Sequence, residues 1–156
     1  MERPPFETME GQAFPLVRQV SVFLENRVGQ LLKLCQSLEH ENVKILALSA
    51  VDSGDCAIIR LIFDVTDQAL AALAKAQFPV SVSELVVVRL PPGKRAMMTV
   101  WSALLTAEIN VSYAYPLLAA GCGPAIALAV DNVEMAVDTL QRHKFEVLGE
   151  ADLEAL

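Results

Sequence analysis

The stretch VSVFLENRVGQLLKLCQSL, residues 20–38, passes from the hydrophobic period of a strand to that of a helix across one short loop. In its first part the apolar positions 20, 22 and 24 alternate with the polar positions 19, 21 and 25, which predicts a strand. After the loop, apolar residues recur at positions 31, 34, 35 and 38, the spacing of a helix with one apolar face. Residues 20–38 therefore predict a strand, a tight loop and a helix.

The rest of the chain continues this alternation and then repeats it. The further elements expected are strands at 43–51 and 56–65 around a turn at 52–55, a helix capped by Thr66 or Asp67, a strand at 80–90, a helix with the apolar stripe Met97, Trp101, Leu104 and Leu105, strands at 111–118 and 125–130 around a turn at 121–124, a helix from 133, and a strand at 145–148. The first six elements run strand, helix, strand, strand, helix, strand, and the order then restarts.

The repeat is visible in the residues themselves. At an offset of 67, Asp64, Leu73 and Phe78 match Asp131, Leu140 and Phe145, and at an offset of 66, Val43-Lys44 matches Ile109-Asn110. Because a crossover through a helix is right-handed, each copy predicts a four-stranded antiparallel sheet with two helices on one face. The predicted fold class is α+β, with two ferredoxin-like βαββαβ units at 17–86 and 87–156 after a flexible tail at 1–16.

Each such unit leaves one face of its sheet bare. The strands at 57–63 and 125–130 are apolar on both faces, and the mean hydropathy of the chain is +0.43. An apolar face has to be covered, so we expect the units to associate within the chain and also between chains, as a homodimer.

Composition and local sequence argue against nucleic-acid and membrane partners and indicate the compartment of the protein. The chain has 156 residues, and its 19 acidic against 12 basic residues give a net charge of -7, which argues against nucleic acid. Residues 109–130 carry no charge and could span a bilayer, but prolines and glycines divide them into two short strands. Cys35, Cys56 and Cys122 show no paired spacing, which is typical of a reducing, cytoplasmic compartment.

No catalytic or metal-binding motif is present in the sequence. His40 and His143 both lie in charged segments at predicted helix ends, where solvated residues are common. A small phosphatase that uses Arg27 is a further alternative, but a phosphate-binding loop needs more than one glycine near the arginine. We therefore expect no catalytic residues, no metal and no cofactor.

The loop between the first strand and the first helix has the most informative chemistry. Gly29 at the start of the helix would leave the amides of residues 28–31 exposed at the positive end of the helix dipole, where they can bind a carboxylate. Asn26 could bind an ammonium or a carboxylate group. The alternative is that Asn26 merely caps the helix and Gly29 merely permits the turn.

Residues 20–49, VSVFLENRVGQLLKLCQSLEHENVKILALS, resemble the ACT domain, a small βαββαβ module that binds amino acids and regulates metabolic enzymes. In that family the first strand is followed by Asp or Asn, a variable residue, Pro, Gly and a leucine-bearing helix, and the second strand begins with a stretch like Gly-Ile-Asn-Ile. The residues that match this pattern are Asn26, Gly29, Leu31, Val43 and Ile45. The resemblance extends over 17–153 as two tandem copies, as in small stand-alone double-ACT proteins.

The sequence departs from the family pattern at several positions. Val28 replaces the usual proline, and Lys44 replaces the usual asparagine, so that a polar contact from this position becomes a cationic one. In the second copy Asn110 and Val111 match the second strand, but Pro92-Gly93 lies about two residues too far from them. We therefore expect the first loop to be the main ligand loop.

By resemblance, ligands lie at the interface between two ACT units, between the first loop of one unit and the start of the second strand of its neighbour. The implied ligand-binding residues are Asn26, Arg27, Val28, Gly29, Gln30, Val43, Lys44 and Ile45, with Gly93, Asn110 and Val111 in the second repeat. The ligand carboxylate would contact the amides of residues 28–30, and Asn26 would hold the amino group.

These observations predict a non-catalytic, cytoplasmic homodimer that binds an amino acid and modulates a partner, such as a regulated enzyme. Neither nucleic acid nor a membrane is expected as a partner. The alternative is a structural or regulatory subunit that binds another protein through its apolar sheets and has no working ligand site.

Overall fold

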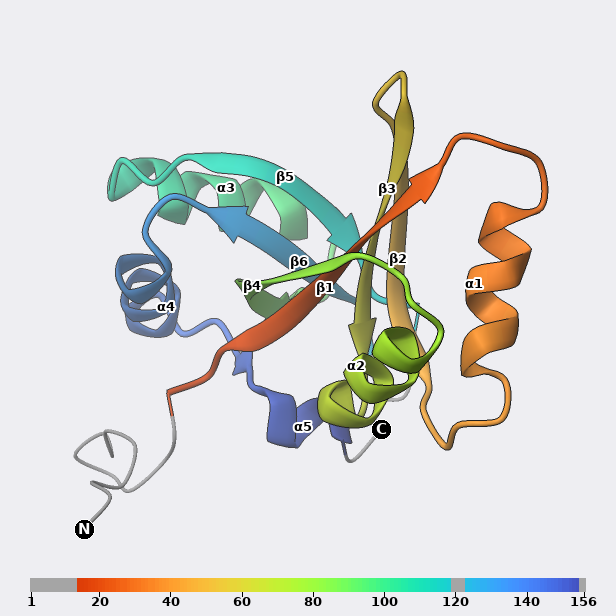
Figure 1. The fold of residues 1–156 in the computed structure, drawn as a ribbon. Coiled ribbons are helices and arrows are strands. Elements are labelled where there is room, and N and C mark those ends of the chain that lie inside the picture. Colours follow the sequence, from red (N-terminus) through yellow and green to blue (C-terminus); the bar gives the residue numbers. More distant parts are fainter. Residues whose placement is uncertain (1–13, 119–122, 155–156) are drawn as a thin grey trace, which may run out of the picture.

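The computed structural model describes residues 14–118 and 123–154, and the turn expected at 121–124 lies largely outside them. The elements in chain order are β1 (Val17–Glu25), α1 (Gln30–Leu38), β2 (Ile45–Asp52), β3 (Cys56–Phe63), α2 (Thr66–Lys75), β4 (Val80–Arg89), α3 (Ala96–Thr106), β5 (Val111–Pro116), β6 (Ala125–Val130), α4 (Val133–Arg142), β7 (Val147–Leu148) and α5 (Glu150–Glu154). Figure 1 shows how they are arranged. The predicted order of strands and helices is confirmed, with the short helix α5 as an unexpected addition.

The strands form one antiparallel sheet in the order β2-β3-β1-β4-β6-β5, and β7 also pairs with β4. The first part of β4 pairs with β1, from Val80 opposite Val22 to Leu85 opposite Val17. Its second part, residues 86–89, pairs with β6 on one edge, and Val87 and Val88 pair with β7 on the other. Thus β4 is the last strand of one βαββαβ unit and the first strand of the next, and the α+β fold of two such units is confirmed. The boundary expected between residues 86 and 87 falls inside this strand.

The repeat predicted from the sequence also appears in the hydrogen bonds. The Asp64 carboxylate accepts a hydrogen bond from the Lys44 amide at 2.7 Å, and the Asp64 amide donates to the Lys44 carbonyl at 3.1 Å. Asp131 makes the same two contacts with Asn110, both at 3.2 Å. The offsets of 66 and 67 residues therefore relate equivalent positions of the two units.

Helices cover one face of each half of the sheet. In the first half, α1 and α2 pack against β1 and β3, and in the second half α3 and α4 pack against β4 and β6. Phe14 and Leu16, which the sequence assigned to the tail, pack against the second of these cores. Residues 1–13 of the expected tail lie outside the described part of the chain.

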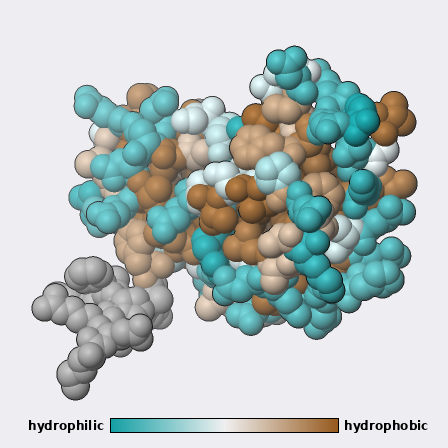
Figure 2. Space-filling model, in the orientation of Figure 1, coloured by the Kyte–Doolittle hydropathy of each residue, from teal (hydrophilic) through white to brown (hydrophobic). Residues whose placement is uncertain are grey.

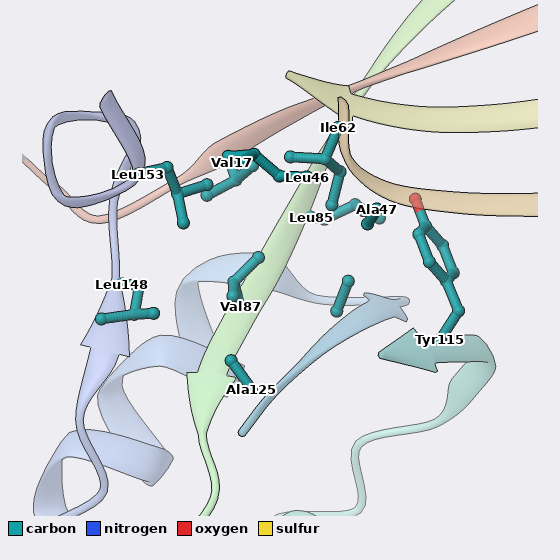
Figure 3. Packing of buried hydrophobic residues seen from close by; sticks show 11 residues of the cluster. Val17, Leu46, Ala47, Ile62, Leu85, Val87, Tyr115, Ala125, Leu148 and Leu153 are labelled. Carbon is teal, nitrogen blue, oxygen red and sulfur yellow. The ribbon is translucent and has the colours of Figure 1, made fainter. Parts of the chain in front are cut away.

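A third core lies between the two sheet faces that α1 to α4 leave uncovered, and α5 adds Leu153 to it. It includes Val17 of β1, Ile62 of β3 and Val87 of β4, and Figure 3 shows Tyr115 of β5 projecting toward Ala47 of β2. The sheet curls so far that the amide of Leu118, just after β5, donates to the Leu46 carbonyl of β2 at 2.6 Å. The bare faces therefore cover each other within one chain, as part of the expected association.

Two local predictions are wrong. Neither Thr66 nor Asp67 caps α2, because Thr66 is the buried first residue of the helix and Asp67 binds Arg18. The inward face of α3 differs in part: Leu104 is buried as predicted, but Leu105 is 75% exposed and Val100, which was not in the predicted stripe, is buried. The polar residues of α3, Thr99, Ser102 and Thr106, are spaced i, i+3 and i+7 and share one face, with Leu104 nearly opposite and Leu105 at the side.

The uncharged segment 109–130 contributes β5 and β6 rather than a helix. Among the residues that the structure describes, no helix has the length and apolar character needed to cross a membrane.

Candidate functional site

The loop between β1 and α1 has the backbone that the glycine predicts. Gly29 is the N-cap of α1 with a φ of 87°, in the left-handed region that side chains disfavour. A Cβ atom built at Gly29 would meet nothing within 4 Å. The backbone conformation, rather than crowding, therefore accounts for glycine at this position.

The start of α1 presents unpaired backbone donors. The Lys33 amide donates to the Gly29 carbonyl at 3.0 Å, which begins the helix, whereas the amides of Val28, Gly29 and Leu31 donate to no protein group in the described ranges. The Val28 side chain is fully exposed at the tip of the loop. These amides lie at the positive end of the helix dipole, so the loop can accept an anion such as a carboxylate.

Asn26 does not cap α1, which rules out that alternative for its role. Its side-chain nitrogen donates to Asp52 Oδ1 at 3.1 Å and to the Gly54 carbonyl at 3.4 Å, so it ties the loop to the turn between β2 and β3. Asn26 Oδ1 has no hydrogen-bond partner among the described residues and is free to accept one. Arg27 forms an ion pair with Glu25.

The residues at the start of β2 lie at the opposite end of the first half of the sheet. Glu25 is opposite Cys56 and Asp52 is opposite Ala57, so the loop and the β2–β3 turn share one end. Ile45 is opposite Phe63 at the other end. Since α1 has 9 residues, its length of about 13 Å separates the loop from Val43, Lys44 and Ile45. One chain therefore does not bring the two groups of predicted residues together.

The second repeat has the same separation and an altered loop. Gly93 has a φ of 112°, but α3 begins at Ala96 with Arg95 as its N-cap. The glycine of the second repeat therefore lies two residues before the N-cap, whereas Gly29 is the N-cap itself. Asn110 and Val111 lie at the start of β5, where the Asn110 backbone binds Asp131. The loop glycine thus holds a different position relative to the helix in the two repeats.

A buried polar cluster between the two halves was not predicted. Gln19, 1% exposed, donates from Nε2 to the Tyr113 hydroxyl at 2.8 Å and to Ser83 Oγ at 3.1 Å, and its Oε1 accepts from the Tyr115 hydroxyl at 2.6 Å. Burial raises the pKa of Tyr115 well above its ordinary value. The Arg60 guanidinium lies 4.1 Å from the centre of the Tyr113 ring, a cation–π contact.

A charged cluster at the start of β1 joins three elements. Arg18 binds both oxygens of Glu150 in α5, through Nε at 2.7 Å and Nη2 at 3.0 Å, and its Nη1 donates to Asp67 of α2 at 2.7 Å. These hydrogen bonds hold the pKa of Glu150 and the pKa of Asp67 below their ordinary values. The cluster fixes the C-terminal helix and lies at the far end of β1 from the Gly29 loop.

Within residues 14–118 and 123–154, no group of three or more His, Cys, Asp or Glu side chains is placed to hold a metal ion. The two cysteines described, Cys35 and Cys56, are free thiols.

The comparisons with known proteins agree with this architecture. Among solved structures, protein BT0572 from Bacteroides thetaiotaomicron is similar with a TM-score of 0.82 and 27% sequence identity, over 90% of this chain and 97% of that one. The regulatory subunit of aspartate kinase from Thermus thermophilus, in its ligand-free form, shares the fold with a TM-score of 0.56 and 12% identity, over 81% of this chain and 91% of that one. The corresponding subunit from Thermus flavus has a TM-score of 0.51 and 11% identity, over 83% and 96% of the two chains.

A comparison with curated protein sequences found no match. The family model that describes the ACT domain pair matches residues 16–156, nearly the whole chain. The protein therefore belongs to the family of ACT domain pairs.

Proposed function

We propose that this ACT pair is a non-catalytic regulatory protein that binds an amino acid at the loop between β1 and α1 and, when occupied, modulates a partner enzyme. The observation that carries the proposal is the Gly29 loop, whose unpaired amides lie beside Asn26 with its free Oδ1. A free amino acid has a carboxylate and an ammonium group on the same carbon atom, and this loop offers donors for one and an acceptor for the other.

The electrostatics of the loop suit this orientation. The unpaired amides of Val28, Gly29 and Leu31 would hold the carboxylate, because the helix dipole adds to their hydrogen bonds. The ammonium group would bind Asn26 Oδ1, near the carboxylate of Asp52, which already accepts a hydrogen bond from Asn26. The ion pair with Glu25 lowers the net positive charge that Arg27 adds to the loop.

A second chain would complete the site, as the resemblance to the family implies. Apolar side chains beside the loop remain exposed on α1, namely those of Leu31 and Leu32, together with Val28 in the loop itself. Figure 2 also shows apolar surface near the middle of the view, where β1 and β4 cross it in Figure 1. A homodimer would cover part of this surface and supply the start of a second β2, with Val43, Lys44 and Ile45, to the loop. Free thiols at Cys35 and Cys56 suit a cytoplasmic protein.

The same arrangement in the second repeat is the weaker candidate. Gly93, Asn110 and Val111 would form it. However, Gly93 lies two residues before the N-cap of α3, whereas Gly29 is itself the N-cap of α1. The alternative of a subunit that docks through its apolar sheets is limited to the sheet surface that stays exposed, with Val80 and Val82 of β4, because the rest of those faces forms the third core within the chain.

Thermal unfolding with each of the twenty amino acids at millimolar concentration tests the proposal. A ligand at one hundred times its Kd adds about 2.7 kcal/mol to the free energy of unfolding, a rise in Tm of roughly 5–11 °C for a chain of this size. If none of the twenty raises Tm, amino-acid binding is disproved.

Variants at the two loop glycines locate the site. Gly29→Val forces a branched side chain into the left-handed region and should abolish the response to the amino acid. Gly93→Val is the matched control, since Gly93 also has a positive φ and open space around it. A response that survives Gly29→Val and disappears in Gly93→Val would assign the ligand to the second repeat instead.

A further inference from the structure

A pocket of about 550 Å³ opens in the second half of the molecule, between α3 and the turn that joins α4 to β7. Its volume lies within the range of small-molecule sites. It lies on the helix-covered side of β4 and β6, in the other repeat from the Gly29 loop, and shares no lining residue with it. It is therefore separate from the amino-acid site proposed above.

The pocket is basic in an acidic protein. Arg95, His143 and Lys144 line it, no carboxylate does, and the chain as a whole has a net charge of -7. In the described part of the chain, the side chains of Arg95 and Lys144 take part in no ion pair or hydrogen bond, whereas four other arginines pair with carboxylates. Two unpaired cations at one pocket provide a site for an anion with more than one charge.

The neutral lining residues add hydrogen-bonding and apolar surface. The three polar residues of α3, Thr99, Ser102 and Thr106, all line the pocket. The hydroxyls of Thr99 and Thr106 donate to backbone carbonyls of their own helix, which leaves the Ser102 hydroxyl as the free donor among them. Met98 and Phe145 supply apolar contacts. This combination suits a small organic anion rather than a bare ion.

His143 also lines the pocket, and a hydrogen bond defines the tautomer of its ring. Its Nδ1 lies 2.8 Å from the Thr139 carbonyl, which can only accept, so Nδ1 carries the proton. Nε2 has no hydrogen-bond partner in the structure as described and is available to a ligand of the pocket.

The basic residues distinguish the second repeat from the first. At offsets of 66 and 67, Arg95 and Lys144 correspond to Gly29 and Gln77. Lys144 and Gln77 both have a φ of 64°, so the left-handed backbone is common to both repeats. The positive charge at this position occurs only in the second repeat. Phe145 is retained from Phe78.

We propose that this pocket binds a small organic anion with at least two negative charges, a phosphate ester or a polycarboxylate, through Arg95 and Lys144. The second repeat would thus sense a ligand of different chemistry from that of the first. Two ligands on one chain would allow the pair to respond to both a zwitterion and a dianion.

Isothermal titration calorimetry of the full chain with inorganic phosphate, citrate and acetate at low ionic strength tests this site. Phosphate or citrate should bind more tightly than acetate, and added salt should weaken the binding. Whichever of phosphate and citrate binds more tightly distinguishes the phosphate source from the carboxylate source. If acetate binds as tightly as both, or no probe binds at millimolar concentration, the proposal is overturned.

Single variants test the residues. Arg95→Gln and Lys144→Gln should each weaken binding roughly tenfold or more, since each removes a charge-assisted contact. Both variants should fold, because Gln77 adopts the backbone of Lys144 in the first repeat and the Arg95 side chain makes no capping bond.

Lys94→Gln removes an equal charge next to the pocket but outside its lining and is the matched control. Equal loss in all three variants would reduce the effect to net charge and refute the site. Gly29→Val should leave the response to the dianion intact, which separates this test from that of the amino-acid site.

Discussion

The hydrogen bond between Gln19 and Tyr115 should couple the two halves of the molecule. Gln19 lies in β1 and Tyr115 in β5, and both are buried between the facing parts of the sheet, with 2.6 Å between Oε1 and the hydroxyl. Gln19→Leu removes the acceptor and leaves a buried hydroxyl donor without a partner. Such a group costs about 1–3 kcal/mol of the free energy of unfolding. Tyr115→Phe leaves the Gln19 Oε1 acceptor unpaired, at a similar cost.

The double variant Gln19→Leu/Tyr115→Phe removes both partners at once and leaves neither group of this bond unpaired. We therefore expect it to lose less stability than the sum of the single variants, with an interaction energy of about 1–2 kcal/mol. A single variant that loses about 2 kcal/mol should lower Tm by roughly 4–8 °C. Urea unfolding followed by circular dichroism measures each free energy, provided that the slope against urea stays constant.

Ser83→Ala is the control for this cycle. Ser83 accepts one hydrogen bond from Gln19 but is exposed to water, so its loss should change stability by no more than about 0.5 kcal/mol. If the two single variants add to the double variant within about 0.3 kcal/mol, the cluster does not couple the halves, and the reasoning from burial is refuted.

The remaining predictions concern α3 and the charged cluster at Arg18. Leu104→Ala should cost about 3–5 kcal/mol in urea unfolding because Leu104 is 1% exposed, whereas Leu105→Ala should cost less than about 0.5 kcal/mol. Equal costs would instead support the stripe predicted from the sequence, which contains both leucines. The hydrogen bonds of Arg18 lower the pKa of Glu150 and the pKa of Asp67 in the folded state, so their contribution is present at neutral pH and is lost as the pH falls through the lowered folded-state pKa values. Arg18→Met should thus lower stability modestly at pH 7, because solvent screens these partly exposed pairs, and by less at pH 3; an equal loss at both pH values would contradict this.

The order of elements and the repeat could be predicted from the sequence because both depend on local periods. The strand at 20–25 and the helix after Gly29 each bury one face, and that pattern is complete within a few residues. The left-handed backbone at Gly29 follows from the same short segment. A resemblance in these residues was enough to indicate the ACT fold, which the whole chain confirms.

Features that depend on distant partners could not be predicted. Gln19 alternates with buried valines, a pattern that predicts a strand but does not indicate that the second half of the sheet covers its polar side chain. The pocket combines Arg95 with Lys144 across nearly fifty residues, and neither stands in a recognisable motif. The separation of Lys44 from Gly29 follows from the strand pairing, which places the two ends of α1 at opposite ends of the sheet.

The shared strand β4 constrains how the protein can change during evolution. Its residues alternate between two cores, with Leu85 and Val87 in the core between the halves and Val86 and Val88 under α3 and α4. An insertion of one residue near position 85 would turn every later side chain of the strand to the wrong face, and deletion would do the same. Neither repeat can be duplicated, exchanged or lost without rebuilding the other. The two halves, although they repeat one motif, therefore form a single structural unit.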